Sequence, residues 1–227
     1  MATIRKHLRP VFVMFQDGIS QVQIEVVLSS INMVLLNAGV NNLIRVTNFG
    51  VWRNSGYQKN GKLLPYQSVD WYIARGFQES RNNHQAYVRE ILVQLWNEPW
   101  QIETPHYDVV VLHSDIYDDN CNFVIGSAIK GFGMVISINR FEGLEHSIQI
   151  ECIKTEVMHE VGHVFGLVPN TRTSNITESL GRHCTNQCVM RQGLAVPHAW
   201  IRYSKERLSS KQAFCSQCQQ DLRNYFR

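Results

Sequence analysis

The chain has 227 residues, of which 44% are hydrophobic and 18% charged, with a formal net charge of +3. This length suffices for one well-cored domain, and the composition is that of a globular protein and excludes extensive disorder. The small positive charge is not concentrated in a Lys/Arg-rich run, so the composition gives no support for nucleic-acid binding.

The first residues indicate no targeting signal. Arg5, Lys6 and Arg9 precede the apolar run at 11–15, which is too short for the core of a signal peptide. No stretch approaches the 18 apolar residues that a membrane span needs. We therefore expect a cytoplasmic protein with no membrane partner, in which the six cysteines are thiols or metal ligands rather than disulfides.

The beginning of the chain predicts a parallel strand–helix–strand unit. Residues 11–15 form an apolar run without alternation, which is typical of a buried strand. Residues 20–37 carry apolar side chains at helical spacing, and Gly39 stands where glycine commonly ends a helix. Residues 43–46 start a second strand, and this order of elements favours a parallel pairing.

The middle of the chain predicts a loop, a helix and three strands. Residues 48–67 are rich in Gly and Asn, which favours a long loop, and residues 83–97 predict a helix that Pro99 stops. The three strands are expected at 107–112, 122–129 and 133–138. We expect one α/β (α+β) domain over 1–227, with a mixed twisted sheet of about five strands in 1–166 and a loop-rich part in 167–227.

A helix predicted at 145–165 carries the segment His159-Glu160-Val161-Gly162-His163. Side chains four residues apart project from nearly one helix face, so His159 and His163 can reach one metal ion. Glu160 lies where a carboxylate can take a proton from a metal-bound water. Gly166 can adopt the positive φ that ends a helix. The alternative is an ordinary amphipathic helix with two exposed histidines.

A catalytic zinc needs a third protein ligand and a vacant position for water. The metzincin pattern places that ligand three residues after the glycine, but Pro169 stands there and cannot bind a metal. His183 is the favoured candidate because of its neighbours, and Glu178 and His198 are competitors. A glutamate ligand is chemically acceptable, so the sequence leaves the three open.

Four cysteines downstream form two close pairs, Cys184 with Cys188 and Cys215 with Cys218. Thiolates at such spacing can surround one zinc ion tetrahedrally and leave no open position, which is typical of a structural site. Disulfides do not suit a cytoplasmic chain, and a redox motif would need a thioredoxin-like context.

The order of these residues resembles the archaemetzincins over about 107–218. The segments that carry the resemblance are His159, Glu160, His163, Gly166, His183-Cys184, Cys188-Val189-Met190, Cys215 and Cys218. The resemblance implies a zincin-like fold and two zinc ions. The catalytic zinc would be bound by His159, His163 and His183, with Glu160 as the general base. The structural zinc would be bound by Cys184, Cys188, Cys215 and Cys218, and Met190 would lie beneath the catalytic site.

Two features depart from the family pattern. The third histidine follows Gly166 by seventeen residues instead of three, an insertion of fourteen. Cys184 and Cys188 enclose three residues where the family usually has four. The longer loop costs roughly 2 kcal/mol by chain-closure scaling, which metal ligation can offset. It could nevertheless reshape the cleft or place a lid over it.

The expected function is hydrolysis of a peptide or protein substrate by zinc-activated water, in a protein expected to be a monomer. The strand at 122–129 could align an extended peptide or could be an ordinary edge strand. One alternative is a catalytically silent zinc protein whose displaced ligand or inserted loop blocks the site. Another is a protein-interaction module that uses the cysteine–zinc knuckle.

Four other side chains have a structural interpretation that we favour over a functional one. Tyr203 could stabilise an oxyanion, but packing is the commoner role of a tyrosine. His113 ends a predicted buried strand, Cys152 is expected in the core, and Cys121 is a loop cysteine without an assigned role.

Overall fold

The computed structural model describes residues 7–51, 58–59, 62–63, 68–119 and 121–227. Arg5, Lys6 and much of the loop predicted at 48–67 lie outside these residues. Inside that predicted loop the structure has two short paired strands, β3 (Gln58–Lys59) and β4 (Lys62–Leu63).

The centre of the molecule is a mixed sheet of five strands in the order β2-β1-β6-β10-β9. The strands are β1 (Val11–Phe15), β2 (Val46–Gly50), β6 (Tyr107–Leu112), β9 (Gly126–Ile129) and β10 (Gly133–Ser137). The first four in spatial order pair in parallel, and β9 pairs antiparallel with β10 at the edge. The expected mixed α/β fold with a sheet of about five strands is therefore confirmed.

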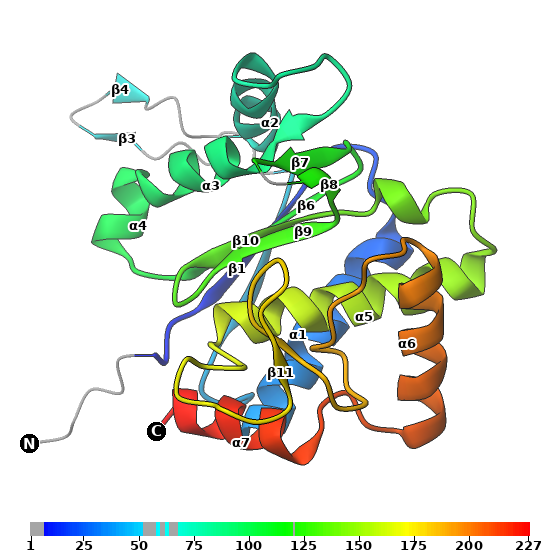
Figure 1. The fold of residues 1–227 in the computed structure, drawn as a ribbon. Coiled ribbons are helices and arrows are strands. Elements are labelled where there is room, and N and C mark those ends of the chain that lie inside the picture. The colour runs from blue at the N-terminus through cyan, green and yellow to red at the C-terminus, as the bar shows by residue number, and fades with distance from the viewer. Residues whose placement is uncertain (1–6, 52–57, 60–61, 64–67, 120) are drawn as a thin grey trace, which may run out of the picture.

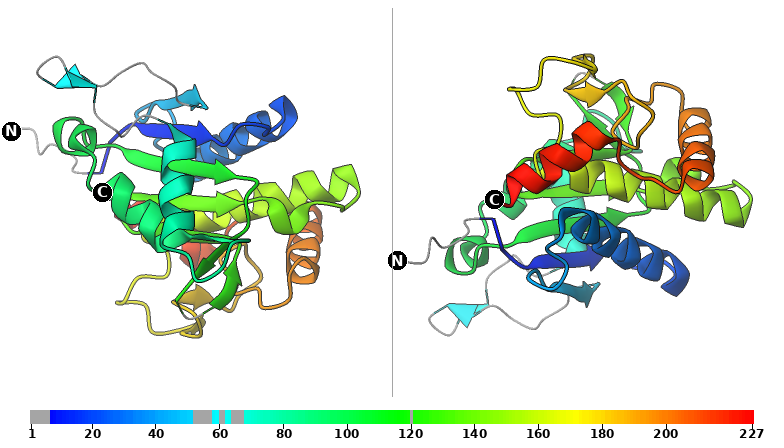
Figure 2. Two further views of the ribbon diagram at one scale, coloured as in Figure 1. Left: turned by 90° about the horizontal axis from the view of Figure 1, so that it is seen from above. Right: turned by 90° about the horizontal axis from the view of Figure 1, so that it is seen from below.

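Helices cover both faces of the sheet, as Figures 1 and 2 show. The helices α1 (Gln21–Ala38) and α5 (His146–Val164) lie on one face, and α2 (Val69–Gln78) and α3 (Val88–Trp96) lie on the other. Alternate side chains of each central strand enter the two cores. Val13 packs with α1 and α5, whereas the neighbouring Met14 packs with α2 and α3.

The helix α1 is fixed at both ends by local sequence. Ser20 and Gln23 form a reciprocal capping box at its start, and Gly39 ends it at φ 73°. By length and mean hydropathy alone α1 would be long enough to cross a membrane, a feature our reading of the sequence did not single out. In this structure its buried side chains, such as Val27 and Ile31, are part of the core beneath the sheet.

Several predicted boundaries were wrong. The predicted strand at 122–129 is two strands, β8 (Cys121–Val124) and β9, because the chain leaves a small sheet with β5 (Ala86–Tyr87) and β7 (Ile116–Asp118) and joins the main sheet. The helix predicted from residue 83 begins at Val88, after β5. The helices α2 and α4 (Pro99–Glu103) and the two helices after residue 197 were not predicted, and β2 lies three or four residues later than expected.

The C-terminal part is loop-rich, as expected. It holds the two-residue strands β11 (Ile176–Thr177) and β12 (His183–Cys184) and the helices α6 (His198–Ser210) and α7 (Ser216–Tyr225). The helix α6 packs against α5 and α7 packs against α1, so this part covers the same sheet face as α1 and α5 (Figure 2). A single 3-10 turn (Asn139–Phe141) connects β10 to α5.

Candidate active site

The helix α5 lies under the edge strand β9 and carries the His159–His163 segment in its last turns. The Glu145 side chain caps its first turn by accepting a hydrogen bond from the Ser147 backbone N–H. At the other end Gly166 has φ 69°, and a Cβ there would lie 2.6 Å from Cε of Lys130. The predicted helix and its glycine stop are thus present, and the chain turns immediately after the segment.

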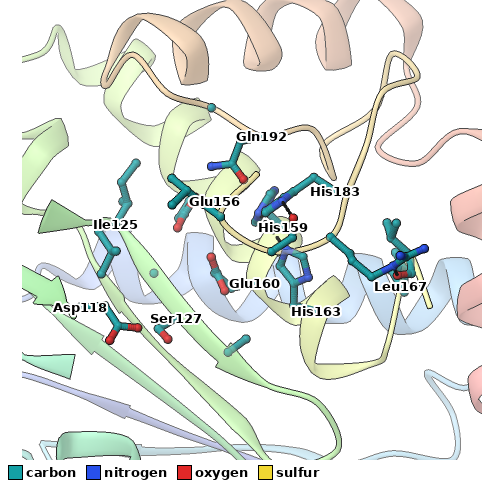
Figure 3. Close-up of a pocket in the computed structure, with 18 of the residues that line it drawn as sticks. Asp118, Ile125, Ser127, Glu156, His159, Glu160, His163, Leu167, His183 and Gln192 are labelled. Carbon is teal, nitrogen blue, oxygen red and sulfur yellow. Dashed lines mark hydrogen bonds between the residues drawn. The ribbon is translucent and has the colours of Figure 1, made fainter. Parts of the chain in front are cut away.

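Three histidine rings converge on one point. Donor nitrogens of His159, His163 and His183 all lie within 4.8 Å of one another, and Nε2 of His159 is 3.1 Å from Nε2 of His163. A tetrahedral zinc ion with Zn–N bonds of about 2.1 Å separates its nitrogens by about 3.4 Å, so the donor set fits zinc. Figure 3 shows the three rings at the wall of the cleft, with Glu160 beside them.

Backbone carbonyls orient two of these rings. Nδ1 of His159 lies 2.7 Å from the Val189 carbonyl oxygen, and Nδ1 of His183 lies 3.2 Å from the Gly181 carbonyl oxygen. Because a carbonyl only accepts, each Nδ1 carries the proton and each Nε2 keeps a free lone pair. Burial lowers the pKa of His159 to about 3, with His183 adding to the effect. Neutral imidazole is the form that binds metals.

A short hairpin returns His183 to the site despite the inserted residues. Strands β11 and β12 pair antiparallel, with Thr177 opposite His183. The competing ligands lie elsewhere. The Glu178 side chain is 68% exposed and paired with Arg182, and His198 is exposed at the start of α6. Of the three candidates that the sequence left open, only His183 therefore joins the other two histidines.

Glu160 is 7% exposed and lies on the floor of the cleft. Burial raises the pKa of Glu160 well above its ordinary value, and the nearby carboxyl of Glu156 raises it further. Glu156 is itself buried, accepts a hydrogen bond of 2.6 Å from Nε1 of Trp200, and has its pKa raised to about 7 by burial. The sequence analysis does not single out Glu156, although its position four residues before Glu160 places it on the same helix face.

Two glycines allow other elements to approach these residues. A Cβ on Gly126 of β9 would lie 2.6 Å from Cγ of Glu160 and 2.7 Å from Oε1 of Glu156. A Cβ on Gly162 would lie 2.4 Å from Sδ of Met190, which is fully buried. Met190 thus packs against the middle of the His159–His163 segment, the position that the resemblance implied for it.

A cleft of about 1050 Å³ opens above these residues. One wall consists of 121–128 from β8 and β9, and α5 contributes Glu156, His159, Glu160 and His163. The other walls come from 166–171 and 180–183, and from 192–194 with Val196 and Trp200. Figure 3 shows Asp118 and Ser127 on the strand side and Gln192 on the side of the C-terminal part.

The four predicted cysteines form a second cluster. Their sulfur atoms all lie within 4.8 Å of one another, with 3.7 Å between Cys184 and Cys215 and 3.6 Å between Cys188 and Cys218. A zinc ion with Zn–S bonds of about 2.3 Å holds tetrahedral sulfurs about 3.8 Å apart, so this donor set also fits zinc. The strand β12 supplies Cys184, the turn after it supplies Cys188, and the start of α7 supplies Cys215 and Cys218.

The remaining candidates have structural surroundings. The Tyr203 hydroxyl donates to the Gln192 carbonyl oxygen at 2.8 Å, and Tyr203 is not among the residues that line the cleft. His113 places Nε2 2.9 Å from the Asp17 carbonyl oxygen, and Cys152 is fully buried. Cys121 is half-buried and lines the cleft.

The comparison with known proteins identifies relatives in sequence and in structure. No family model matches the chain. It is 41% identical over 81 residues to an archaemetzincin from Nanoarchaeum equitans, a match that covers 36% of each chain. It is 35% identical over 82 residues to an archaemetzincin from Archaeoglobus fulgidus, covering 36% of this chain and 42% of the relative. The sequence matches thus span well under half the length of these relatives.

Solved structures extend the likeness to almost the whole chain. An archaemetzincin from Methanopyrus kandleri matches with a TM-score of 0.60 and 19% identity, over 99% of this chain and 98% of the other. The fold is that of the archaemetzincins. The archaemetzincin of Archaeoglobus fulgidus matches with a TM-score of 0.55, 20% identity and coverage of 93% and 99%. A zinc-dependent peptidase from Methanocorpusculum labreanum matches with a TM-score of 0.53 and 18% identity, over 93% of this chain and 99% of the other. The archaemetzincin resemblance that the sequence implied is thus confirmed.

Proposed function

We propose that this chain is a zinc metallopeptidase. The observation that carries the proposal is the convergence of His159, His163 and His183 beside the Glu160 carboxylate, at the wall of an open cleft. Three protein ligands leave the fourth position of a tetrahedral zinc free for water. The names of the related proteins support the same class, since one of the structural neighbours is a zinc-dependent peptidase.

Each residue of this group would have a defined task. A bound zinc supplies an acidified water and polarises the substrate carbonyl. Glu160 accepts the proton of the water on a carboxylate oxygen and later donates it to the leaving amine. The carbonyls of Val189 and Gly181 hold the rings of His159 and His183 in the metal-binding orientation. The burial of Glu160 strengthens its interactions with charge that develops during the reaction.

We further propose that the substrate is an extended peptide lying along β9. Within the described part of the chain this strand pairs with β10 alone, and its other edge faces the cleft, where Gly126, Ser127 and Ala128 form part of the wall. An unpaired strand edge offers backbone donors and acceptors to an added strand. A peptide paired there would pass beside Glu160, because a Cβ on Gly126 would lie only 2.6 Å from Cγ of Glu160.

We propose a second, structural zinc at the four cysteines. Their sulfur separations fit a zinc ion, and four thiolate ligands leave no position for water. Cys184, Cys188 and Cys218 are buried, which supports a structural role over direct capture of a partner protein. None of the six cysteines is in a disulfide, which agrees with the reducing cytoplasm that we propose as the location.

The cleft argues against a catalytically silent protein. The segment 167–182 contributes to the walls, yet about 1050 Å³ stays open above the histidines and Glu160. Glu160 adds to this argument, because a purely structural metal site has no use for a buried base beside it.

The decisive experiment compares wild type with Glu160→Gln on a peptide library, with zinc counted in both proteins. We expect cleavage by the wild type, a loss of at least about a hundredfold in the variant, and unchanged zinc content. Zinc content of His183→Ala tests the ligand set, since we expect one ion fewer per chain. A wild type that carries both zinc ions and cleaves no peptide would refute the peptidase.

A further inference from the structure

Arg172 lies in the middle of the inserted segment 167–182 and is buried, with 8% of its surface exposed. A charged side chain is rarely buried unless partners for its charge and its donors are built around it. No sequence pattern singles out this arginine, because the insertion has no counterpart in the family pattern. The hydrogen-bond and ion-pair partners of Arg172 therefore indicate the role of the insertion.

The guanidinium of Arg172 donates to two of the four cysteine sulfurs. Nη2 lies 3.0 Å from Sγ of Cys184, and Nη1 lies 3.2 Å from Sγ of Cys218. Its other acceptors are the carbonyl oxygens of Ser174 at 3.1 Å and Asn175 at 3.1 Å, Oε1 of Gln217 at 3.0 Å and Oδ2 of Asp221 at 3.2 Å. One residue thus joins the insertion to both halves of the cysteine cluster.

The remaining sulfur contacts come from the turn after β12. The backbone N–H of Asn186 donates to Cys184, its side-chain amide donates to Cys215, and the Met190 N–H donates to Cys188, each at 3.4 Å. Together with Arg172, these donors give every sulfur at least one N–H partner. Such a set suits thiolates rather than thiols.

Charge explains why a buried arginine suits this place. Four thiolates around one divalent zinc ion carry a formal charge of about −2, and a buried charge needs compensation. Arg172 brings a permanent positive charge to within 3.2 Å of two sulfurs. Asp221 holds the guanidinium in orientation from α7 and also accepts from the Val168 N–H at 3.2 Å.

We propose that Arg172 is a positioning residue which clamps the inserted segment onto the cysteine–zinc centre, so that this centre holds the wall of the substrate cleft in place. The inference rests on the structural zinc proposed above. It assigns to the insertion the role of a fixed wall attached to a metal centre, one of the two possibilities, a reshaped cleft or a lid, that the sequence left open.

The contacts of the segment show how the clamp reaches the cleft. Arg182 donates to the carbonyl oxygens of Arg172, Pro169 at 3.3 Å and Val168 at 3.4 Å, and so fastens the end of the insertion to its beginning. The stretches 166–171 and 180–183, on either side of Arg172, both line the cleft. His183 and Cys184 are adjacent, so one two-residue strand serves both metal sites.

The test uses three variants of the full chain loaded with zinc. Arg172→Met removes the charge and the donors, and Arg172→Lys keeps the charge but loses the planar fork. Arg182→Met is the matched control, because Arg182 fastens the same segment and touches no sulfur in the described contacts. The measurements are zinc per chain, the alkylation rate of each cysteine with N-ethylmaleimide, and hydrogen exchange of the backbone over 167–182.

For Arg172→Met we expect Cys184 and Cys218 to be alkylated at least about tenfold faster than in wild type, because a zinc-bound thiolate is already deprotonated and becomes a stronger nucleophile when it loses hydrogen-bond donors. Backbone hydrogen exchange over 167–182 should rise as well. The alkylation and exchange rates of Arg172→Lys should lie between those of wild type and Arg172→Met. Arg182→Met should raise exchange but leave the alkylation rates near those of the wild type.

Two results would overturn the clamp. One is a zinc-loaded Arg172→Met protein with wild-type alkylation and exchange, and the other is an equal rise in alkylation for Arg182→Met. If Arg172→Met does not fold, the alkylation rate of Cys184 in Arg172→Lys decides, since a wild-type rate there refutes the sulfur contact. Failure of the structural zinc itself gives a different result: the wild type would hold no zinc at the cysteines and all four would react freely.

Discussion

The side chain that Gly162 lacks decides how closely Met190 can approach the metal-binding helix. Glycine in the middle of a helix costs about 1 kcal/mol relative to alanine, so the sequence alone favours an alanine at this position. The tertiary structure reverses this preference, because a Cβ would lie 2.4 Å from Sδ of Met190. Gly126 has the same role on β9, where its missing side chain leaves room for two carboxylates.

We predict that Gly162→Ala lowers the free energy of unfolding by about 1–3 kcal/mol, because overpacking outweighs the gain in helix propensity. Urea unfolding of wild type, Gly162→Ala, Met190→Ala and the double variant measures this. The truncated Met190 should relieve part of the clash, so the two substitutions should be non-additive. If the changes in unfolding free energy of the two single variants simply add up in the double variant, the contact between position 162 and Met190 is contradicted.

Glu98 is a buried carboxyl outside the candidate site, 4% exposed, with Oε2 lacking a hydrogen-bond partner among the described residues. Burial, and then the charge of Asp108, raise the pKa of Glu98 to about 9. Above its unfolded pKa the unfolded chain releases a proton that the folded protein keeps. Stability therefore falls as pH rises towards 9.

We predict that Glu98→Gln and wild type unfold at similar urea concentrations at pH 5, whereas at pH 8 the variant is more stable by on the order of 2 kcal/mol. The exposed Glu142 supplies the control, and Glu142→Gln should follow the wild type at both pH values. Parallel stability curves for wild type and Glu98→Gln would show that Glu98 ionises freely in the fold.

At the scale of elements, the hairpin of β11 and β12 compensates for the displaced third ligand. The pairing of Thr177 with His183 closes residues 178–182, the last part of the inserted segment, into a loop, and Gly181 turns the chain there at φ 100°. The Gly181 carbonyl oxygen also accepts the hydrogen bond that orients His183. A tight turn in the hairpin thus sets both the position and the orientation of the ligand.

We predict that Gly181→Ala weakens zinc binding at the histidine site about tenfold or more, because the strained turn shifts both His183 and the carbonyl that orients it. Gly143 offers a matched control, with φ 80°, open space around its Cβ and no contact with the site. Gly143→Ala should lose similar stability and keep wild-type zinc affinity at the histidines. Equal zinc affinities of Gly181→Ala and Gly143→Ala would show that the hairpin turn does not position His183 for zinc binding.

At the scale of the whole molecule, two parts of the chain differ in what stabilises them. Two cores of buried apolar side chains stabilise the sheet and its helices, and the stretch from 166 to 197 adds a few side chains, such as Leu167 and Val189, to one of them. The stretch from 166 to 197 contains only the four residues of β11 and β12 in regular secondary structure. We therefore expect metal ligation to contribute more to the stability of this stretch than its backbone hydrogen bonds do.

Removal of zinc with a chelator should therefore loosen the chain unevenly. We predict that backbone hydrogen exchange rises at least about tenfold over 167–190 and near the start of α7, with little change in β1, β6 and β10. Exchange measured before and after chelation tests this, and zinc restored at one ion per cysteine cluster should reverse it over 167–190. A uniform rise across the sheet would show that the metals stabilise the whole fold.

Much of this organisation could be predicted from the sequence, because it depends on local patterns. The apolar runs at 11–15 and 107–112 gave two central strands, and the four-residue spacing of His159 and His163 placed both on one helix face. The helices α2 and α4 were missed because short helices with mixed composition have a weak pattern. The break of the strand at 122–129 depends on which sheet each half joins, a choice made by distant residues.

The sequence by itself determined which residue types are available for the two metal sites and the order in which they occur. The cytoplasmic location, the monomeric state and the domain boundaries stay predictions from it. Only the tertiary structure selected His183 over Glu178 and His198, placed Glu156 beside Glu160, and buried Arg172 against the cysteine sulfurs. The physical reason is that ligand selection, desolvation and charge pairing depend on distances between segments far apart in the chain, which spacing along the sequence does not encode.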